Sequence, residues 1–402
     1  MKSKIPDLRI RKMNDAPVLH DRSFVLYWMI AARRMGCHEG VERAADWARH
    51  LQKPLLVFEP LRLDYPYASE RLHRFVIQGM ADNQAALAEQ DVRYFPYVEP
   101  DRGAGKGLLQ SLGQEACLVV TDDYPTFMLP SMIRAAAAQL DVRLEAIDGN
   151  GLLPLRAVER TYPTAYAFRR DLQQLLPDFL EQRPKANPLT GLDTGKARIP
   201  SAITSRWPAA GRGRLNGDLD GLSFANAVQP APDAGGATEA GKRLARFLKD
   251  PWSRYAEQAN HPEQQATSRL SPYLHFGFIS PHEIFAAITR REEWTPNQLG
   301  KKAQGKRSGW WGMSEGAEAF LDQLVTWREL GYNYCAHRDD VQDFASLPPW
   351  AQETLTLHAE DPREYVYSRD AFESAATHDP LWNAAQNQLR REGHIHNYLR
   401  ML

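Results

Sequence analysis

The sequence predicts an α/β protein in which a doubly wound parallel sheet is followed by an all-helical part. Three apolar runs, at residues 24–30, 54–58 and 117–120, are typical of strands buried on both faces of such a sheet. Stretches of helical periodicity separate these runs, and this strand–helix alternation favours a doubly wound domain. From residue 241 onward the pattern is mostly helical, which indicates a second domain.

Two helices are expected between the predicted strands. Apolar residues recur at helical spacing over residues 41–51 and again over residues 72–87. The chain then becomes rich in Pro, Gly, Ala and Asp from about residue 185 to residue 240, which predicts a linker with short elements. We therefore expect an α/β domain over residues 1–150, an interdomain linker over 151–240 and a helical domain over 241–402.

Composition excludes several classes of protein. The net charge of −1 excludes a chain that coats nucleic acid by bulk charge, although a local basic patch remains compatible with it. Cys37, Cys117 and Cys335 form no CxxC pair, which argues against a zinc site and indicates a reducing, cytoplasmic compartment. His394 and His396 have no other metal-ligating residue at ligand spacing, so we expect no metal. No apolar run reaches the ~18 residues of a membrane span, and the N-terminus lacks the apolar core of a signal peptide.

The segment 267–277 carries the first candidate site. Its sequence is Thr-Ser-Arg-Leu-Ser-Pro-Tyr-Leu-His-Phe-Gly, in which Ser271 suits an N-cap and Pro272 the first helical position. The hydroxyl groups of Thr267 and Ser268 lie just before this helix start. A helix N-terminus with neighbouring hydroxyls can bind an anion such as a dinucleotide pyrophosphate. An ordinary capped helix is the alternative.

A second candidate site lies on the helical stripe of residues 320–330. Gln323 and Trp327 are four residues apart and therefore share a helix face. An amide beside an indole can hydrogen-bond one base edge and stack on another, and the alternative is a core Trp with a solvated amide. Arg328 and Glu329 are expected to point elsewhere, into a buried pair.

A basic run precedes two aromatic residues in the helical part. Trp310 and Trp311 follow four cations that suit phosphate binding, namely Lys301, Lys302, Lys306 and Arg307. The two indoles suit stacking on bases, which makes the segment a candidate nucleic-acid contact. A charged surface loop that leads into core Trp residues is the alternative, and the sequence leaves both open.

Two further segments are less informative. The glycines of residues 103–107 lack the spacing of a phosphate-binding P-loop and predict a surface turn that enters a helix at Leu108. Asp122 and Asp123 follow the third predicted strand, where carboxylates often face a ligand crevice. N-capping of the next helix is the alternative for these two carboxylates.

Together these segments resemble the photolyase/cryptochrome superfamily, and most closely the class II cyclobutane pyrimidine dimer photolyases. Residues 267–277 are similar to the flavin-binding signature of that family, and residues 320–333 to the helix that lines flavin and substrate. The string Thr-His-Asp-Pro-Leu-Trp-Asn-Ala-Ala-Gln at residues 377–386 resembles class II in particular. Residues 25–29 and 68–75 are also similar, and the similarity is weakest between about residues 185 and 240.

The resemblance implies a light-driven DNA repair enzyme. The Rossmann-like N-terminal domain would hold an antenna chromophore, in many members a deazaflavin or a folate, and the helical domain would hold FAD. The implied reaction is electron transfer from reduced, photoexcited FAD to a cyclobutane pyrimidine dimer that is flipped out of double-stranded DNA. The resemblance also implies a monomer.

The same resemblance assigns roles to individual residues. The FAD contacts that match are Tyr255, Thr267, Ser268, Leu270, Ser271 and Leu274, with Arg328 and Asn333 on the flavin-side helix. Trp327 matches the residue that packs against the dimer, and Gln323 the residue that hydrogen-bonds it. Trp382 matches one member of the Trp chain that re-reduces the flavin.

The sequence departs from the class II pattern in three places. Gln323 stands where the best-known members carry Glu, and an amide can donate a hydrogen bond but cannot hand over a proton. Ala259 stands where an Arg is expected, which removes one cationic contact. The relatives continue past the position of Leu402 with a further Trp-containing stretch, so we expect a C-terminally truncated form whose FAD pocket is open on one side.

These departures leave alternatives to repair. One is a photolyase-like flavoprotein that has lost repair and acts as a light sensor or in another role. Another is a fragment that folds only in part. A nucleotide-binding α/β protein without light chemistry is disfavoured because the P-loop is absent.

Overall fold

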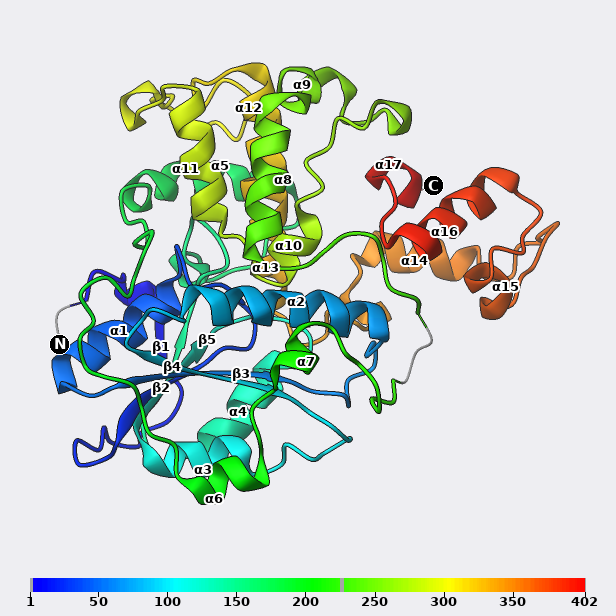
Figure 1. The fold of residues 1–402 in the computed structure, drawn as a ribbon. Coiled ribbons are helices and arrows are strands. Elements are labelled where there is room, and N and C mark those ends of the chain that lie inside the picture. The colour runs from blue at the N-terminus through cyan, green and yellow to red at the C-terminus, as the bar shows by residue number, and fades with distance from the viewer. Residues whose placement is uncertain (1–2, 225–227, 402) are drawn as a thin grey trace.

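The computed structural model describes residues 3–224 and 228–401. A six-stranded sheet of order β1-β6-β5-β2-β3-β4 forms the N-terminal half, with β1 antiparallel to β6 and all other neighbours parallel. Helices cover both faces of this sheet, and a second, helical layer lies above it (Figure 1). The strands are β1 (Ile10–Lys12), β2 (Phe24–Trp28), β3 (Leu55–Leu61), β4 (Val92–Val98), β5 (Ala116–Asp122) and β6 (Leu144–Ile147).

The three predicted strands are confirmed as β2, β3 and β5, the middle of the sheet. All residues of β2 and β5 are buried, because both strands have neighbours on either side and helices on both faces. This double burial explains why their sequences are continuous apolar runs rather than alternating ones. The sequence reasoning missed β4, whose burial is interrupted at Arg93 and Tyr94, and the short strands β1 and β6.

Helices of the N-terminal half begin at side-chain caps where the sequence offers a suitable residue. Ser69 accepts a hydrogen bond from the backbone N–H of Leu72 at the start of α2, and Thr164 accepts one from Ala167 at the start of α5. Gly107, in the left-handed region with φ of 89°, precedes α3, so the predicted surface turn is confirmed. The helices up to residue 215 are α1 (Glu39–Leu51), α2 (Glu70–Ala86), α3 (Leu108–Glu115), α4 (Leu129–Gln139), α5 (Ala165–Leu175), α6 (Ser201–Arg206) and α7 (Arg212–Leu215).

The helical half is built around one apolar cluster. Its members come from the later helices and also from residues 152–180, including Phe168 and Leu172 of α5. Part of the segment that the sequence assigns to the linker therefore packs into the helical core. The remaining helices are α8 (Ala237–Lys249), α9 (Tyr255–Gln258), α10 (Ser271–His275), α11 (Pro281–Arg291), α12 (Glu315–Leu321), α13 (Arg328–Ala336), α14 (Pro349–Leu357), α15 (Arg369–Glu373), α16 (Pro380–Glu392) and α17 (Asn397–Arg400).

The last four helices form a group of their own at one side of the molecule (Figure 1). Many of their apolar side chains are exposed, such as Trp350, Leu357 and Leu381. Polar contacts join them to the rest of the chain, since Arg71 of α2 donates to the carbonyls of Leu389 and Arg390. No helix in the described part of the chain is long and apolar enough to span a membrane.

Candidate functional site

A π-helical turn interrupts the helix that carries the second candidate site. The turn covers Asp322–Trp327 and joins α12 to α13. Gln323 is exposed and Trp327 is 49% exposed, whereas the intervening residues are buried. Both side chains are thus at the surface, so the alternative of a core Trp is wrong, while the spacing itself predicts only that the two residues share a helix face. π-Helical turns are rare and are frequent at functional sites.

The basic loop of residues 301–309 lies against this turn. Its cations Lys301, Lys302, Lys306 and Arg307 are all exposed. The Nε atom of Arg307 lies 3.6 Å from a carboxylate oxygen of Asp322, the first residue of the π-helical turn. The structure therefore brings two of these cations, Lys306 and Arg307, to the turn that carries the amide and the indole.

The two indoles that follow the basic loop do not belong to this surface. Trp310 and Trp311 are 5% and 6% exposed and lie in the helical core, where Trp311 packs on Phe285 and Trp294. The hypothesis that they stack on bases is therefore wrong. The reason is that Trp311 packs on apolar rings of α11 and the loop after it, and Trp310 packs on Trp311, which leaves only the preceding cations at the surface.

The predicted helix start near residue 271 needs one correction. Ser271 is the first residue of α10 rather than its N-cap, because Leu270 already has helical backbone angles and occupies the cap position. The hydroxyl of Ser268 instead accepts a hydrogen bond from the backbone N–H of Leu270, at 3.3 Å. No side chain in the described part of the chain caps α10. Its first-turn N–H groups are thus available to an anion.

The residues around α10 divide into polar donors and apolar walls. Thr267 and Ser268 are half-buried and Ser271 is exposed, while Leu270 is buried and Leu274 is half-buried. Tyr255 of α9 is also buried, and its ring packs edge-on against those of Phe247 and Phe320. Burial, aided by the charge of Asp322, raises the pKa of Tyr255 to about 12, so its hydroxyl keeps its proton. The hydroxyls of Thr267, Ser268 and Ser271, at and just before the start of α10, suit the phosphates of a dinucleotide cofactor.

Comparison of the whole chain with known proteins identifies its family. No family model matches the chain. A deoxyribodipyrimidine photo-lyase of Methanothermobacter thermautotrophicus is 30% identical over 400 residues, which cover 98% of this chain and 79% of that protein. Proteins with the same name from Oryza sativa and Potorous tridactylus are each 26% identical, over 94% and 98% of this chain and 71% and 69% of their own. The chain belongs to the photolyase/cryptochrome family.

Solved structures share the fold of this photolyase-family chain. A class III photolyase from Agrobacterium tumefaciens matches with a TM-score of 0.65 at 18% identity, covering 95% of this chain and 71% of that one. A Synechocystis cryptochrome matches with a TM-score of 0.62 at 15% identity, covering 94% and 73%. The predicted fold, an α/β sheet domain followed by a helical one, is therefore confirmed.

Arg328 and Glu329 connect the helical half to the loop after β6. The guanidinium group of Arg328 donates to the carbonyl of Asn150. The carboxylate of Glu329 accepts the backbone N–H groups of Leu152 and Leu153, at 2.7 and 3.1 Å. The expected pair of the two side chains is absent from the described residues, because each satisfies backbone groups of this loop instead.

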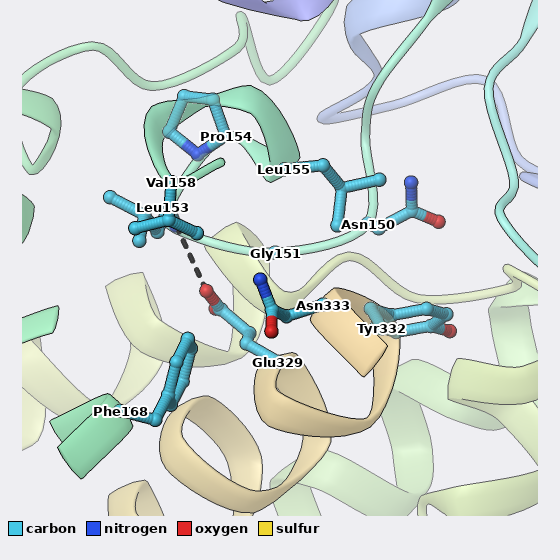
Figure 2. Close-up of a pocket in the computed structure, with 10 residues that line it drawn as sticks. All are labelled: Asn150, Gly151, Leu153, Pro154, Leu155, Val158, Phe168, Glu329, Tyr332 and Asn333. Carbon is cyan, nitrogen blue, oxygen red and sulfur yellow. Dashed lines mark hydrogen bonds between the residues drawn. The ribbon is translucent and has the colours of Figure 1, made fainter. Parts of the chain in front are cut away.

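A small cavity of about 10 Å³ lies between this loop and α13 (Figure 2). The amide nitrogen of Asn333 donates to the carbonyl of Arg160, and its buried oxygen has no hydrogen-bond partner among the described residues. Asn333 is therefore turned to the interdomain loop and away from the exposed face of Gln323 and Trp327. Residues that line the cavity are Asn150, Gly151, Leu153, Pro154, Leu155, Val158, Phe168, Glu329, Tyr332 and Asn333.

Two further residues that the sequence singles out, Trp382 and Asp122, lie away from the π-helical turn. Trp382 lies on α16, where its ring packs on Phe372 at 5.0 Å, apart from α12 in Figure 1. Asp122 accepts the backbone N–H groups of residues 30–32 and the hydroxyl of Tyr27. Both hypotheses for Asp122, a ligand crevice and an N-cap, are wrong, since its oxygens are engaged in closing the loop after β2. No metal-ligating cluster occurs within residues 3–224 and 228–401, which include His394 and His396.

The sequence reasoning missed the residues that hold the basic loop in place. Arg169 and Gln173 of α5 are 6% and 5% exposed, and both hydrogen-bond backbone groups of residues 305–306. The only local signal was two long polar side chains, four residues apart, on an otherwise amphipathic helix. Their partners are more than 130 positions away in the sequence.

Proposed function

We propose that this chain is a class II-like deoxyribodipyrimidine photo-lyase that repairs cyclobutane pyrimidine dimers in double-stranded DNA under blue light. The observation that carries the proposal is the exposed pair Gln323 and Trp327 on a π-helical turn beside the cations Lys306 and Arg307. An indole can stack on an extruded base, an amide can hydrogen-bond its edge, and cations bind the phosphates. Curated relatives named deoxyribodipyrimidine photo-lyase support this reaction.

FAD is the proposed cofactor, and it supplies the light-driven electron when bound. Thr267, Ser268 and Ser271 would hold its phosphates and ribityl chain, since their hydroxyls gather at the uncapped start of α10. Leu270, Leu274 and Tyr255 would form the apolar walls. Arg328 lies near the end of this helix, since its charge adds to the effect of burial in lowering the pKa of His275.

The contacts of Arg328 and Asn333 suggest how these two residues would serve the cofactor. Each binds a backbone carbonyl of the interdomain segment, at Asn150 and Arg160. They would therefore fix the position of α13, and with it the π-helical turn, against the N-terminal half. We further propose Trp382 as a member of the Trp chain that re-reduces the flavin, and an antenna chromophore, a deazaflavin or a folate, in the domain of residues 1–150.

The proposed domain limits are a linker over residues 151–240 and a cofactor-binding helical domain over 241–402, except that residues 152–180 pack into the helical core and belong with it. We infer a monomer that works in the cytoplasm, where its three free thiols would stay reduced.

A light-dependent repair assay tests the function. The chain would be reconstituted with FAD, reduced, and mixed with an oligonucleotide that carries one thymine dimer. We expect thymine ultraviolet absorbance to recover in blue light and not in darkness. A preparation that holds no flavin after reconstitution would overturn the cofactor proposal.

The second candidate is a photolyase-family flavoprotein without repair activity. Gln323 favours it, because its amide can hold a dimer by hydrogen bonds but cannot pass it a proton. In the same assay this candidate predicts bound, reducible FAD and no recovery of thymine absorbance in light.

A further inference from the structure

We infer that helix α5 positions the DNA-binding surface: Arg169 and Gln173 hold the basic loop of residues 301–309 in register with the π-helical turn. Lys306 and Arg307 would then meet phosphates that flank the bases facing Gln323 and Trp327. This inference rests on the proposed function and adds the residues that set the geometry of its DNA contact.

Helix α5 presents two different faces. Phe168 and Leu172 are 1% and 2% exposed and belong to the apolar core of the helical half. Arg169 and Gln173, one position further along in each case, are also buried but are polar. Burial of a guanidinium and an amide is costly unless their hydrogen bonds are satisfied. Their partners therefore decide what this face is for.

Gln173 binds backbone groups of two successive residues of the basic loop. Its amide oxygen accepts the N–H of Gly305 at 2.8 Å, and its amide nitrogen donates to the carbonyl of Lys306 at 3.1 Å. Gly305 has φ of +69°, and a Cβ there would lie 2.9 Å from the carbonyl oxygen of Tyr166. The loop thus lies directly on α5, and only glycine fits at the point of contact.

Arg169 connects the loop to the π-helical turn. One guanidinium nitrogen donates to the carbonyl of Gly305 at 3.0 Å, and Nε donates to Asp322 at 2.9 Å. The other oxygen of Asp322 is buried, has no hydrogen-bond partner among the described residues, and faces Arg307 at 3.6 Å. Since the side chain of Arg307 is 78% exposed, Asp322 attracts its charge without removing it from the surface.

A second anchor fixes the far end of the loop. Glu318 of α12 accepts the backbone N–H groups of Gly309 and Gly312, both at 2.9 Å. Lys306 and Arg307 therefore project from a segment held at both ends. A preorganised cation loses less conformational freedom when it binds a phosphate, so this arrangement should increase affinity and fix the register of the DNA.

The test compares Arg169→Lys and Gln173→Leu with Arg170→Lys, the matched control on the exposed face of the same helix. A lysine at position 169 can pair with Asp322, but its single ammonium group cannot at the same time donate to the carbonyl of Gly305, as the planar guanidinium group of Arg169 does. Binding to a duplex with one thymine dimer and to the undamaged duplex would be measured over a range of salt concentrations. We expect about tenfold weaker binding for both test variants and a salt slope that falls by about one. Arg170→Lys should behave as the unmodified chain does.

A double-mutant cycle separates positioning from general stability. In a chain that already carries Lys306→Ala and Arg307→Ala, Arg169→Lys should have no further effect on DNA affinity if it acts through these cations. An undiminished effect in that background, or unchanged affinity and slope in both test variants, would overturn the inference. If the unmodified chain shows no light-dependent repair but these binding effects are observed, the proposed reaction is refuted and the positioning role of α5 is not.

Discussion

Glu329 is expected to make the stability of this protein depend on pH near neutrality. Its carboxylate is 4% exposed and accepts two backbone N–H groups from Leu152 and Leu153. Burial raises its pKa from 4.5 to about 7, although these hydrogen bonds and the charges of Arg328 and Arg9 act in the opposite direction. The substitution Glu329→Gln removes this ionisation while it keeps the shape of the side chain.

The sign of the effect follows from proton binding. The folded state holds the Glu329 proton up to about pH 7, whereas the unfolded chain releases it near pH 4.5. The contribution of this group to stability is therefore fully present below pH 4.5 and is lost as the pH rises through about 7. The gap between the two pKa values corresponds to roughly 3 kcal/mol in the free energy of unfolding.

Urea unfolding of the unmodified chain and of Glu329→Gln at several pH values from 4.5 to 8 measures this contribution. We expect the difference between the two proteins to change by roughly 3 kcal/mol over that range, in favour of the unmodified chain at low pH. Altered hydrogen bonds to Leu152 and Leu153 would add only a constant offset. Burial lowers the pKa of His38 to about 4, so this group makes the chain more stable as the pH rises, opposite to the effect of Glu329. His38 is present in both proteins, so its contribution cancels in the difference between them.

Glu353→Gln, on the exposed surface of α14, is the matched control for this experiment. Its difference from the unmodified chain should stay flat with pH across the window in which Glu329 titrates. A flat difference for Glu329→Gln as well would show that the buried carboxyl titrates in the folded state as it does in the unfolded one, and would refute the reasoning.

Three further predictions concern the cavity and the exposed face. Gly151→Ala should destabilise the chain by about 2 kcal/mol, because the added Cβ would lie within 2.8 Å of the buried carboxylate of Glu329. The control Gly331→Ala should not destabilise it, because a Cβ at that position meets no atom within 4 Å. Denaturant unfolding would show this. Trp327→Ala should weaken binding to dimer-containing DNA by about 10- to 100-fold in an equilibrium titration, whereas Trp350→Ala, on the C-terminal helices, should leave it unchanged. Gln323→Glu should raise the repair yield per absorbed photon by about twofold or more, because a carboxyl group can pass on a proton; an unchanged or lower yield would contradict this role.

The sequence predicted best where local pattern determines structure. The central strands were found because burial on both faces makes them continuously apolar. The spacing of Gln323 and Trp327 predicted that they share a helix face but left open whether the indole is buried, and the structure exposes it. Predictions failed where a pattern fits two environments. A basic run before Trp310 and Trp311 is compatible with stacking surfaces or with core residues, and only the position of α11 decides between them.

The contacts that hold the candidate site together were beyond local pattern for a physical reason. Arg169 and Asp322 are 153 positions apart, and each is a charged residue beside apolar ones on its own helix. Such a residue is either exposed to solvent or buried against a partner, and its spacing from the apolar residues of its helix does not distinguish the two cases. A buried charge requires a partner, however, so once apolar packing brings α5 against the π-helical turn, Arg169 and Asp322 are constrained to meet. The surface that would bind DNA thus depends on a polar contact that the packing of the apolar core imposes.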